Sequence, residues 1–205
     1  MRRSNLCLLL MTLMLAATVQ QVSAYPRPAR GTARPEVTFQ PGPLRMFVDA
    51  DGTRYWYLVY DVVNTSGEDR TWAPSSVLYT DKGEIRRDGE GVSHQARKAI
   101  MDHVGDPLIE PKVAIIGVLR QGTGHARRGM LVWPAGTKHV NELRIFVEGI
   151  SPETAIVPHP GTGDPVTLRK NLYLHYLVGG EAAARGDQAI DLHPSYTAEE
   201  HWIFR

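Results

Sequence analysis

A serine in the segment Gly91-Val92-Ser93-His94-Gln95 has neighbours typical of an enzyme nucleophile. The segment resembles the G-x-S-x-G elbow, in which a serine lies on a tight turn between a strand and a helix. That turn needs an apolar strand before the serine and a second glycine after it. Here the mostly charged residues 86–90 come first and Gln95 replaces the glycine. Ser93 as the N-cap of a helix accounts for the same residues, so we expect no catalytic residue here.

Acidic residues and histidines are the candidate metal ligands. Asp49-Ala50-Asp51-Gly52 is similar to the start of a calcium loop, but position 12 of that loop would be Tyr60, which has no carboxylate. An Asp-Gly pair between two apolar runs favours a β-hairpin turn instead. No two of the eight histidines have the spacing of an H-x-H or H-E-x-x-H motif, although distant histidines could still converge. We therefore predict no metal and no other cofactor.

Four aromatic residues are the candidates for binding a ligand. Tyr55 and Tyr57 alternate with Trp56 along one strand and therefore project from its opposite face. Trp72 and Trp133 lie near the ends of other strands. Exposed rings on a sheet can stack on sugars, whereas most aromatic rings fill a core, and the sequence leaves both interpretations open.

Residues 1–24 have the three parts of an export signal. Arg2 and Arg3 form a positive start, residues 6–19 form an apolar run of 14 residues, and Val22-Ser23-Ala24 fits a signal-peptidase site. The apolar run is short for a membrane-spanning helix, which needs roughly 20 residues. We therefore predict an exported protein of the periplasm or the extracellular space, with no stable membrane anchor after signal cleavage.

Composition excludes several classes of function. The only cysteine, Cys7, lies within the predicted signal, so the mature protein would have no disulfide and no cysteine-ligated metal centre. Loss of Arg2 and Arg3 leaves 21 basic and 22 acidic residues, and such a nearly neutral chain lacks the basic surface that nucleic-acid binding requires. We expect an unknown protein or glycan partner and no nucleic acid.

The elements that would position these residues follow a proline-rich segment. Residues 25–43 contain five prolines and three arginines, a composition that favours an extended arm. From residue 44 to residue 205, short apolar runs alternate with turn signals, which predicts about nine or ten strands. One helix interrupts them, with Ser93 as its N-cap and Gly105 at its end. We predict a mainly β, antiparallel sandwich over 44–205 with one short helix near residues 93–104.

The strand over residues 54–63 shows which of its faces belongs to the core. A period of two places four uniformly apolar side chains on one face, whereas the other face also carries Asp61. We therefore predict that the first face packs in the core. Its four residues are Trp56, Leu58, Tyr60 and Val62.

The run from Trp56 to Gly67, followed by Asp81-Lys82-Gly83, resembles the opening of immunoglobulin-like domains in exported bacterial proteins. In those domains an apolar strand ends in Asn and a Ser/Thr/Gly turn, and a later hairpin carries Asp-x-Gly. The segment 129–134 is similar to the strand that follows a Gly-rich loop in the same domains. The resemblance covers about 80 residues and implies an immunoglobulin-like antiparallel β-sandwich, but no activity.

These observations favour an exported, non-catalytic accessory or interaction module of the periplasm or cell envelope. The alternative is a carbohydrate-binding module that uses the four aromatic residues, and an unrecognised hydrolase is the third. Ring exposure discriminates the first two, because a sugar platform needs at least two coplanar rings that face solvent.

We expect Tyr25 to be the N-terminal residue of the mature protein, because Val22-Ser23-Ala24 places small side chains before it. Intact-mass measurement of the exported protein checks this. A mature species that retains residues 1–24 would contradict both the cleavage and the absence of an anchor.

Overall fold

The computed structural model describes residues 37–136, 139–180, 182–194 and 201–205. The predicted export signal and residues 25–36 of the predicted arm lie outside these residues. The described part is mainly β with antiparallel sheets, which confirms this part of the sequence prediction. Within that part, no helix is both long enough and apolar enough to span a membrane.

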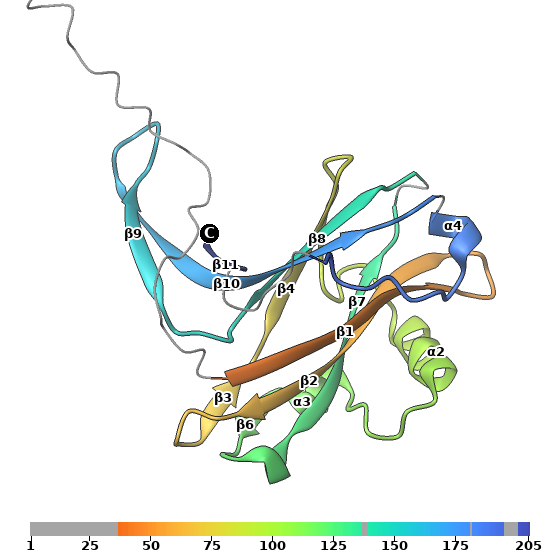
Figure 1. Cartoon of the computed structure of the whole chain (residues 1–205), viewed down its shortest axis with the longest axis horizontal. Coiled ribbons are helices and arrows are strands. Elements are labelled where there is room, and N and C mark those ends of the chain that lie inside the picture. Colours follow the sequence, from red (N-terminus) through yellow and green to blue (C-terminus); the bar gives the residue numbers. More distant parts are fainter. Residues whose placement is uncertain (1–36, 137–138, 181, 195–200) are drawn as a thin grey trace, which may run out of the picture.

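The smaller sheet contains β1 (Val37–Val48), β2 (Arg54–Asn64) and β7 (Arg127–Pro134). Its strands are antiparallel and lie in the order β1-β2-β7 (Figure 1). β1 and β2 form the predicted hairpin, in which the Gly52 N–H donates to the Asp49 carbonyl at 2.9 Å. Gly52 has φ = 84°, which glycine adopts without steric cost, so the Asp-Gly pair is a turn.

β1 begins at Val37, within the segment 25–43 that the sequence predicts as an extended arm. Residues 37–41 pair with β2, and the side chains of Val37 and Phe39 are buried in the core. β1 is an edge strand, and its register shifts between Pro41 and Leu44. Edges and bulges tolerate proline because no N–H donor is needed there, which is why a proline-rich sequence still forms a strand.

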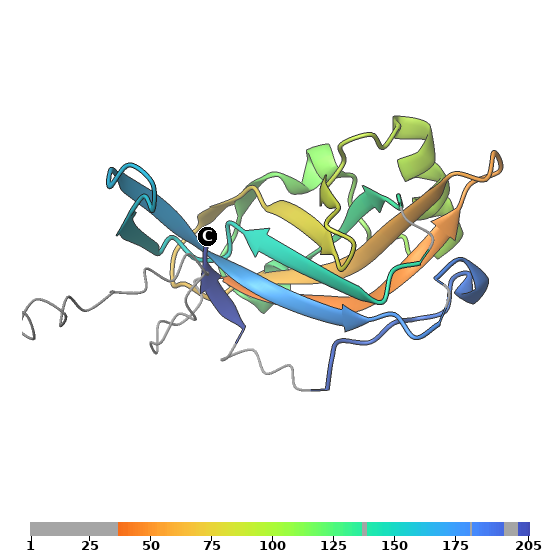
Figure 2. The same ribbon diagram turned by 90° about the horizontal axis from the view of Figure 1, so that it is seen from above.

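The remaining strands form a larger sheet and a short two-stranded sheet. They are β3 (Arg70–Trp72), β4 (Ser75–Thr80), β5 (Ile85–Arg87), β6 (Gly117–Leu119), β8 (Glu142–Glu148), β9 (Thr154–Pro158), β10 (Pro165–Leu177) and β11 (Trp202–Phe204). The larger sheet has the order β11-β10-β8-β4-β5, and β9 pairs with the first part of β10. The β9–β10 hairpin projects beyond the rest of the sheet (Figures 1 and 2). β3 and β6 pair separately.

The predicted helix is α2 (His94–Val104). The Ser93 hydroxyl oxygen accepts a hydrogen bond from the Ala96 N–H at 3.0 Å, so Ser93 is the N-cap. Gly105 ends the helix in the left-handed region, with φ = 65°. The other helical segments of the described residues are α3 (Lys112–Ile115), α4 (Ala182–Arg185) and the 3-10 turn η2 (Thr123–His125). The inserted helix is therefore confirmed, whereas α3 was not predicted.

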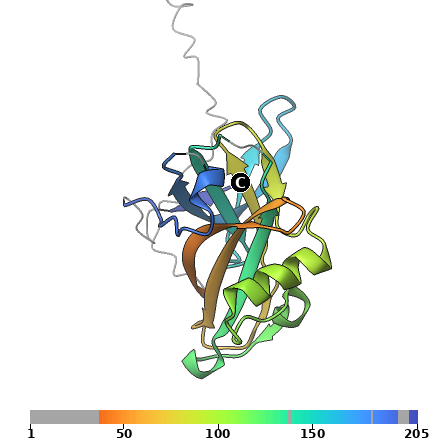
Figure 3. The ribbon, with the colours of Figure 1, turned by 90° about the vertical axis from the view of Figure 1, so that its right-hand side faces the viewer.

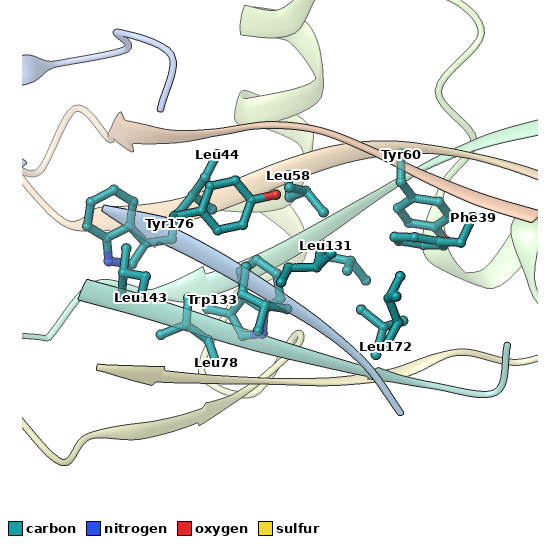
Figure 4. Close-up of a cluster of buried hydrophobic side chains, with 14 of the residues drawn as sticks. Phe39, Leu44, Leu58, Tyr60, Leu78, Leu131, Trp133, Leu143, Leu172 and Tyr176 are labelled. Carbon is teal, nitrogen blue, oxygen red and sulfur yellow. The ribbon is translucent and has the colours of Figure 1, made fainter. Parts of the chain in front are cut away.

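The main core lies between the smaller and the larger sheet, which pack face to face (Figure 4). The predicted core face of β2 is confirmed, since all four of its side chains are at most 2% exposed: Trp56, Leu58, Tyr60 and Val62. They belong to one apolar cluster with side chains of the larger sheet that include Leu78, Leu143, Ile145, Leu172 and Leu174. Burying a side chain of this kind stabilises the fold by about 1.5–3 kcal/mol.

Part of the outer face of the smaller sheet is also buried, because α2 packs across it (Figure 3). A second apolar cluster joins β2 and β7 to α2 through Tyr55, Tyr57, Met130, Val132, Ala96 and Ile100. The first half of β2 is therefore buried on both of its faces. The period of two separates these faces but does not show that a helix covers one of them.

The segment after α4 links the two sheets. Leu44 of β1 and Ile190 exchange backbone hydrogen bonds at 2.9 and 2.8 Å, and Leu192 bridges to Tyr176 of β10. The Tyr176 hydroxyl donates to the Gly42 carbonyl at 3.2 Å. Polar and apolar contacts together therefore fasten β1 to the larger sheet at this edge of the core.

We expect Leu58→Ala to lower the free energy of unfolding by about 2–5 kcal/mol, because Leu58 is fully buried between the sheets. Urea unfolding measures the change. Val113→Ala is the matched control: its side chain is 88% exposed, so a change within about 0.5 kcal/mol is expected. Similar values for the two variants would contradict the assigned core face.

Candidate functional site

The four aromatic residues predicted to bind a ligand are all buried. Tyr55 and Tyr57 lie beneath α2, whereas Trp72 and Trp133 lie in the main core. Their exposures are between 0% and 6%. These rings therefore do not form an exposed stacking surface, and of the two interpretations that the sequence left open they follow the one in which aromatic rings fill a core. The physical reason is that α2 covers the face of β2 on which Tyr55 and Tyr57 lie.

The other sequence candidates have local structural partners. The Ser93 hydroxyl caps α2, as described above. Asp49 accepts a hydrogen bond from the Ala50 N–H and Asp51 accepts one from the Thr53 N–H, both at 2.8 Å. The bond from Thr53 lowers the pKa of Asp51. Among the described residues, no group of three His, Cys, Asp or Glu side chains is arranged as metal ligands.

The outer face of the larger sheet carries a row of aromatic and imidazole rings that sequence reasoning missed. We term it the aromatic face and define it as Tyr79, Phe146, Tyr173, His175, His193 and His201. The first four alternate with core residues such as Leu78, Ile145 and Leu174, so they point away from the core. All six are partly exposed. The alternation of side chains along β4, β8 and β10 would have identified the first four from the sequence.

The rings of the aromatic face contact one another across strands. Tyr173 pairs with Phe146 in the register of β10 and β8, and their ring centroids are 5.3 Å apart. The Tyr173 ring is nearly parallel to those of His201 (8°, centroids 5.8 Å apart) and His175 (23°, 6.1 Å apart). His175 in turn stacks on His193 at 5.0 Å. β8, β10 and the residues His193 and His201 therefore build one continuous ring surface.

Charged side chains border this surface. The Arg205 guanidinium lies 4.6 Å from the Phe146 ring centroid and donates to the Tyr79 hydroxyl at 2.8 Å. Glu142 lies 3.5 Å from His175 Nε2 and also pairs with Arg144. β11 holds Arg205 in place, because Arg205 and Arg169 of β10 exchange backbone hydrogen bonds. The face thus combines flat rings with cationic and anionic groups.

Burial shifts the pKa values of the two central rings. Partial burial raises the pKa of the Tyr173 hydroxyl, which is protonated at neutral pH even at its ordinary value. Burial lowers the pKa of His175, because the charged imidazolium loses solvation. The Glu142 carboxylate raises this pKa in part, and His193 lowers it further. At neutral pH the centre of the face is therefore an uncharged ring surface.

A buried carboxylate organises the opposite side of the molecule. Asp88 has a side chain only 3% exposed, and it accepts a hydrogen bond from the Val132 N–H of β7 at 2.8 Å. It also pairs with Arg97 of α2 and Lys112 of α3. Arg97 donates in addition to the Met130 carbonyl at 3.3 Å. These bonds occupy polar groups on the outer edge of β7, which would otherwise be open to another strand.

A second polar cluster lies where the segment after α4 meets the smaller sheet. The Tyr57 hydroxyl donates to Asp187, and His103 Nε2 lies 3.1 Å from the same carboxylate. Arg45 donates to the Asp187 carbonyl at 2.6 Å. Burial and the Asp187 carboxylate raise the pKa of Tyr57. The cluster anchors this segment to the smaller sheet and α2.

No family model, no curated protein and no solved structure matches this chain.

We expect stability to fall as pH is lowered from about 7 to 5, in part because of His175. Its pKa is lower in the folded protein than in the unfolded chain, whose histidines titrate near about 6.5. The unfolded state therefore binds more protons in this window, so the contribution of His175 is present above about pH 6.5 and is lost as pH falls. One histidine contributes a slope of at most about 1.4 kcal/mol per pH unit.

Urea unfolding of His175→Gln at several pH values measures this contribution. We expect the variant to show a smaller pH slope than the unsubstituted protein. His125→Gln, which removes an exposed histidine in η2, should retain the original slope. Identical slopes in both variants would show that burial of His175 does not govern its protonation.

Proposed function

We propose that this chain is an exported, non-catalytic immunoglobulin-like module that binds a protein partner in the periplasm or cell envelope through its aromatic face. The strand order supports the fold assignment. In immunoglobulin domains strands A, B and E share one sheet, and strands C, F and G share the other, which can be extended by C′. β1-β2-β7 matches A-B-E, and β5-β4-β8-β10 matches C′-C-F-G. α2 occupies the chain position between C′ and E, where strand D would lie.

The row of partly exposed rings carries the functional proposal. An antiparallel sheet that packs on one side usually presents polar side chains to solvent on the other. Here the solvent side of β8 and β10 presents Phe146, Tyr173 and His175, with Arg205 beside them. Aromatic residues and arginine are enriched at protein interfaces, where their large surfaces are desolvated on binding. A protein partner would complete the burial of rings that the fold buries only in part.

A glycan partner is the second candidate, and the partly exposed rings favour it. Tyr173 stacks on His201 and on His175, and the exposed part of these rings could contact the apolar face of a sugar. Glu142 and Arg144 lie close enough to His175 to hydrogen-bond sugar hydroxyls. This version of a carbohydrate-binding module uses different rings from those that the sequence suggested.

Tyr173→Ser tests the role of the aromatic face. Loss of a central tyrosine from an interface typically costs 2 kcal/mol or more, so we expect the dissociation constant for the partner to rise by about 30-fold. Thr167→Ser is the matched control, because Thr167 is exposed on the same strand but lies in the projecting hairpin. Thermal melts of both variants establish that they fold.

The partner class is identified with a photo-crosslinking residue in place of Arg144, whose side chain is 51% exposed at the margin of the aromatic face. We expect a protein adduct in the envelope fraction that is lost in Tyr173→Ser and retained in Thr167→Ser. Calorimetric titration with soluble envelope polysaccharides examines the second candidate. If glycan binding depends on Tyr173 and no protein adduct forms, the partner is a glycan rather than a protein. An adduct that Tyr173→Ser leaves unchanged, or no binding of either class, would overturn the proposal.

A further inference from the structure

A groove with a volume of about 650 Å³ lies between α2 and α3. α2 covers the outside of the smaller sheet, so this groove and the aromatic face lie on opposite sides of the two-sheet core. We propose that the groove binds a monocarboxylate with an apolar chain, such as a medium-chain fatty acid. This inference is independent of the proposed function, because it rests on different residues.

The walls of the groove are largely apolar. Val92 and Met101 contribute from the α2 side, and Val113 and Ile116 contribute from the α3 side. Val113 is 88% exposed and Ile116 is 43% exposed, which is unusual for two neighbouring aliphatic residues beside a groove. The volume is within the range of about 300–1,000 Å³ that is typical of small-molecule sites. An alkyl chain would therefore find apolar contacts on both sides.

The charges beside these walls favour an anion. Arg97 and Lys112 share one carboxylate, that of the buried Asp88, so this cluster retains one excess positive charge. The third cation of the groove, Lys98, is paired with Asp102 one helical turn away. The excess charge is therefore located at the Arg97–Lys112 end of the groove.

The geometry of that end suits a carboxylate. The Lys112 side chain is 38% exposed, and its ammonium group donates to the carbonyl and the carboxylate of Asp88, which leaves one N–H donor for a ligand. Arg97 is held in place by the Met130 carbonyl and Asp88. A ligand carboxylate could accept hydrogen bonds from these donors while its chain lies along Val113 and Ile116. A single excess charge is neutralised by one carboxylate, and a cationic amphiphile of the same length would be repelled. The ligand class is thus a monoanion with one apolar tail.

Decanoate and decyltrimethylammonium, both used below the concentrations at which they aggregate, are matched probes of this site. Each has a chain of ten carbons, counted with the carboxyl carbon of decanoate, and their charges are opposite. Calorimetric titration of the purified protein should show decanoate binding at least about tenfold more tightly, with an affinity that decreases as salt is added. Equal binding of the two probes, or no binding of decanoate, would overturn the proposal.

Val113→Asp places a negative charge at the exposed wall without disturbing the core. We expect it to weaken decanoate binding by about tenfold or more, since it removes an apolar contact and repels the carboxylate. Val118→Asp is the control, because Val118 is a similarly exposed valine on β6 that does not line the groove. Equal losses in the two variants, checked for folding by thermal melts, would contradict a specific site.

Two further measurements distinguish other possible occupants of the groove from a monocarboxylate. Sedimentation would reveal a second copy of this chain in the groove as a dimer that Val113→Asp converts to a monomer. Titration with a short acidic peptide would reveal a peptide site if the peptide bound and decanoate did not. Either result would overturn the monocarboxylate assignment.

Discussion

The buried carboxylate of Asp88 is the interaction on which the arrangement around the smaller sheet depends. It accepts a hydrogen bond from β7 and pairs with one cation from α2 and one from α3. A buried charge is tolerated only when it is paired and hydrogen-bonded, so its three partners must lie close together in the folded state. Both helices are thereby held against the outer edge of β7.

The position of α2 has two consequences for function. It buries Tyr55 and Tyr57, so these two rings, which the strand pattern made candidate ligand contacts, do not face solvent. It also faces α3 across a groove whose walls are apolar and whose end carries excess positive charge. The same contacts that close the edge of β7 therefore create the groove.

The two outer faces of the domain differ because different elements cover them. On the smaller sheet, α2 supplies apolar side chains that bury the outer face of β2 and β7. On the larger sheet, the segment that ends at Arg205 adds a strand to the edge of β10 and places one guanidinium over the rings. That coverage is partial, so Phe146 and Tyr173 remain partly exposed.

The sequence by itself determined the local features of this protein, because short-range rules govern them. The turn at Gly52, the cap at Ser93 and the core face that includes Leu58 each depend on residues within a few positions. Only the tertiary structure decided which faces stay open. Asp88 and Val132 are 44 residues apart in the chain, and no periodicity within one strand or helix shows that they will meet. What covers each face of a sheet depends on such long-range pairings, and for this reason the aromatic face and the groove emerged only from the fold.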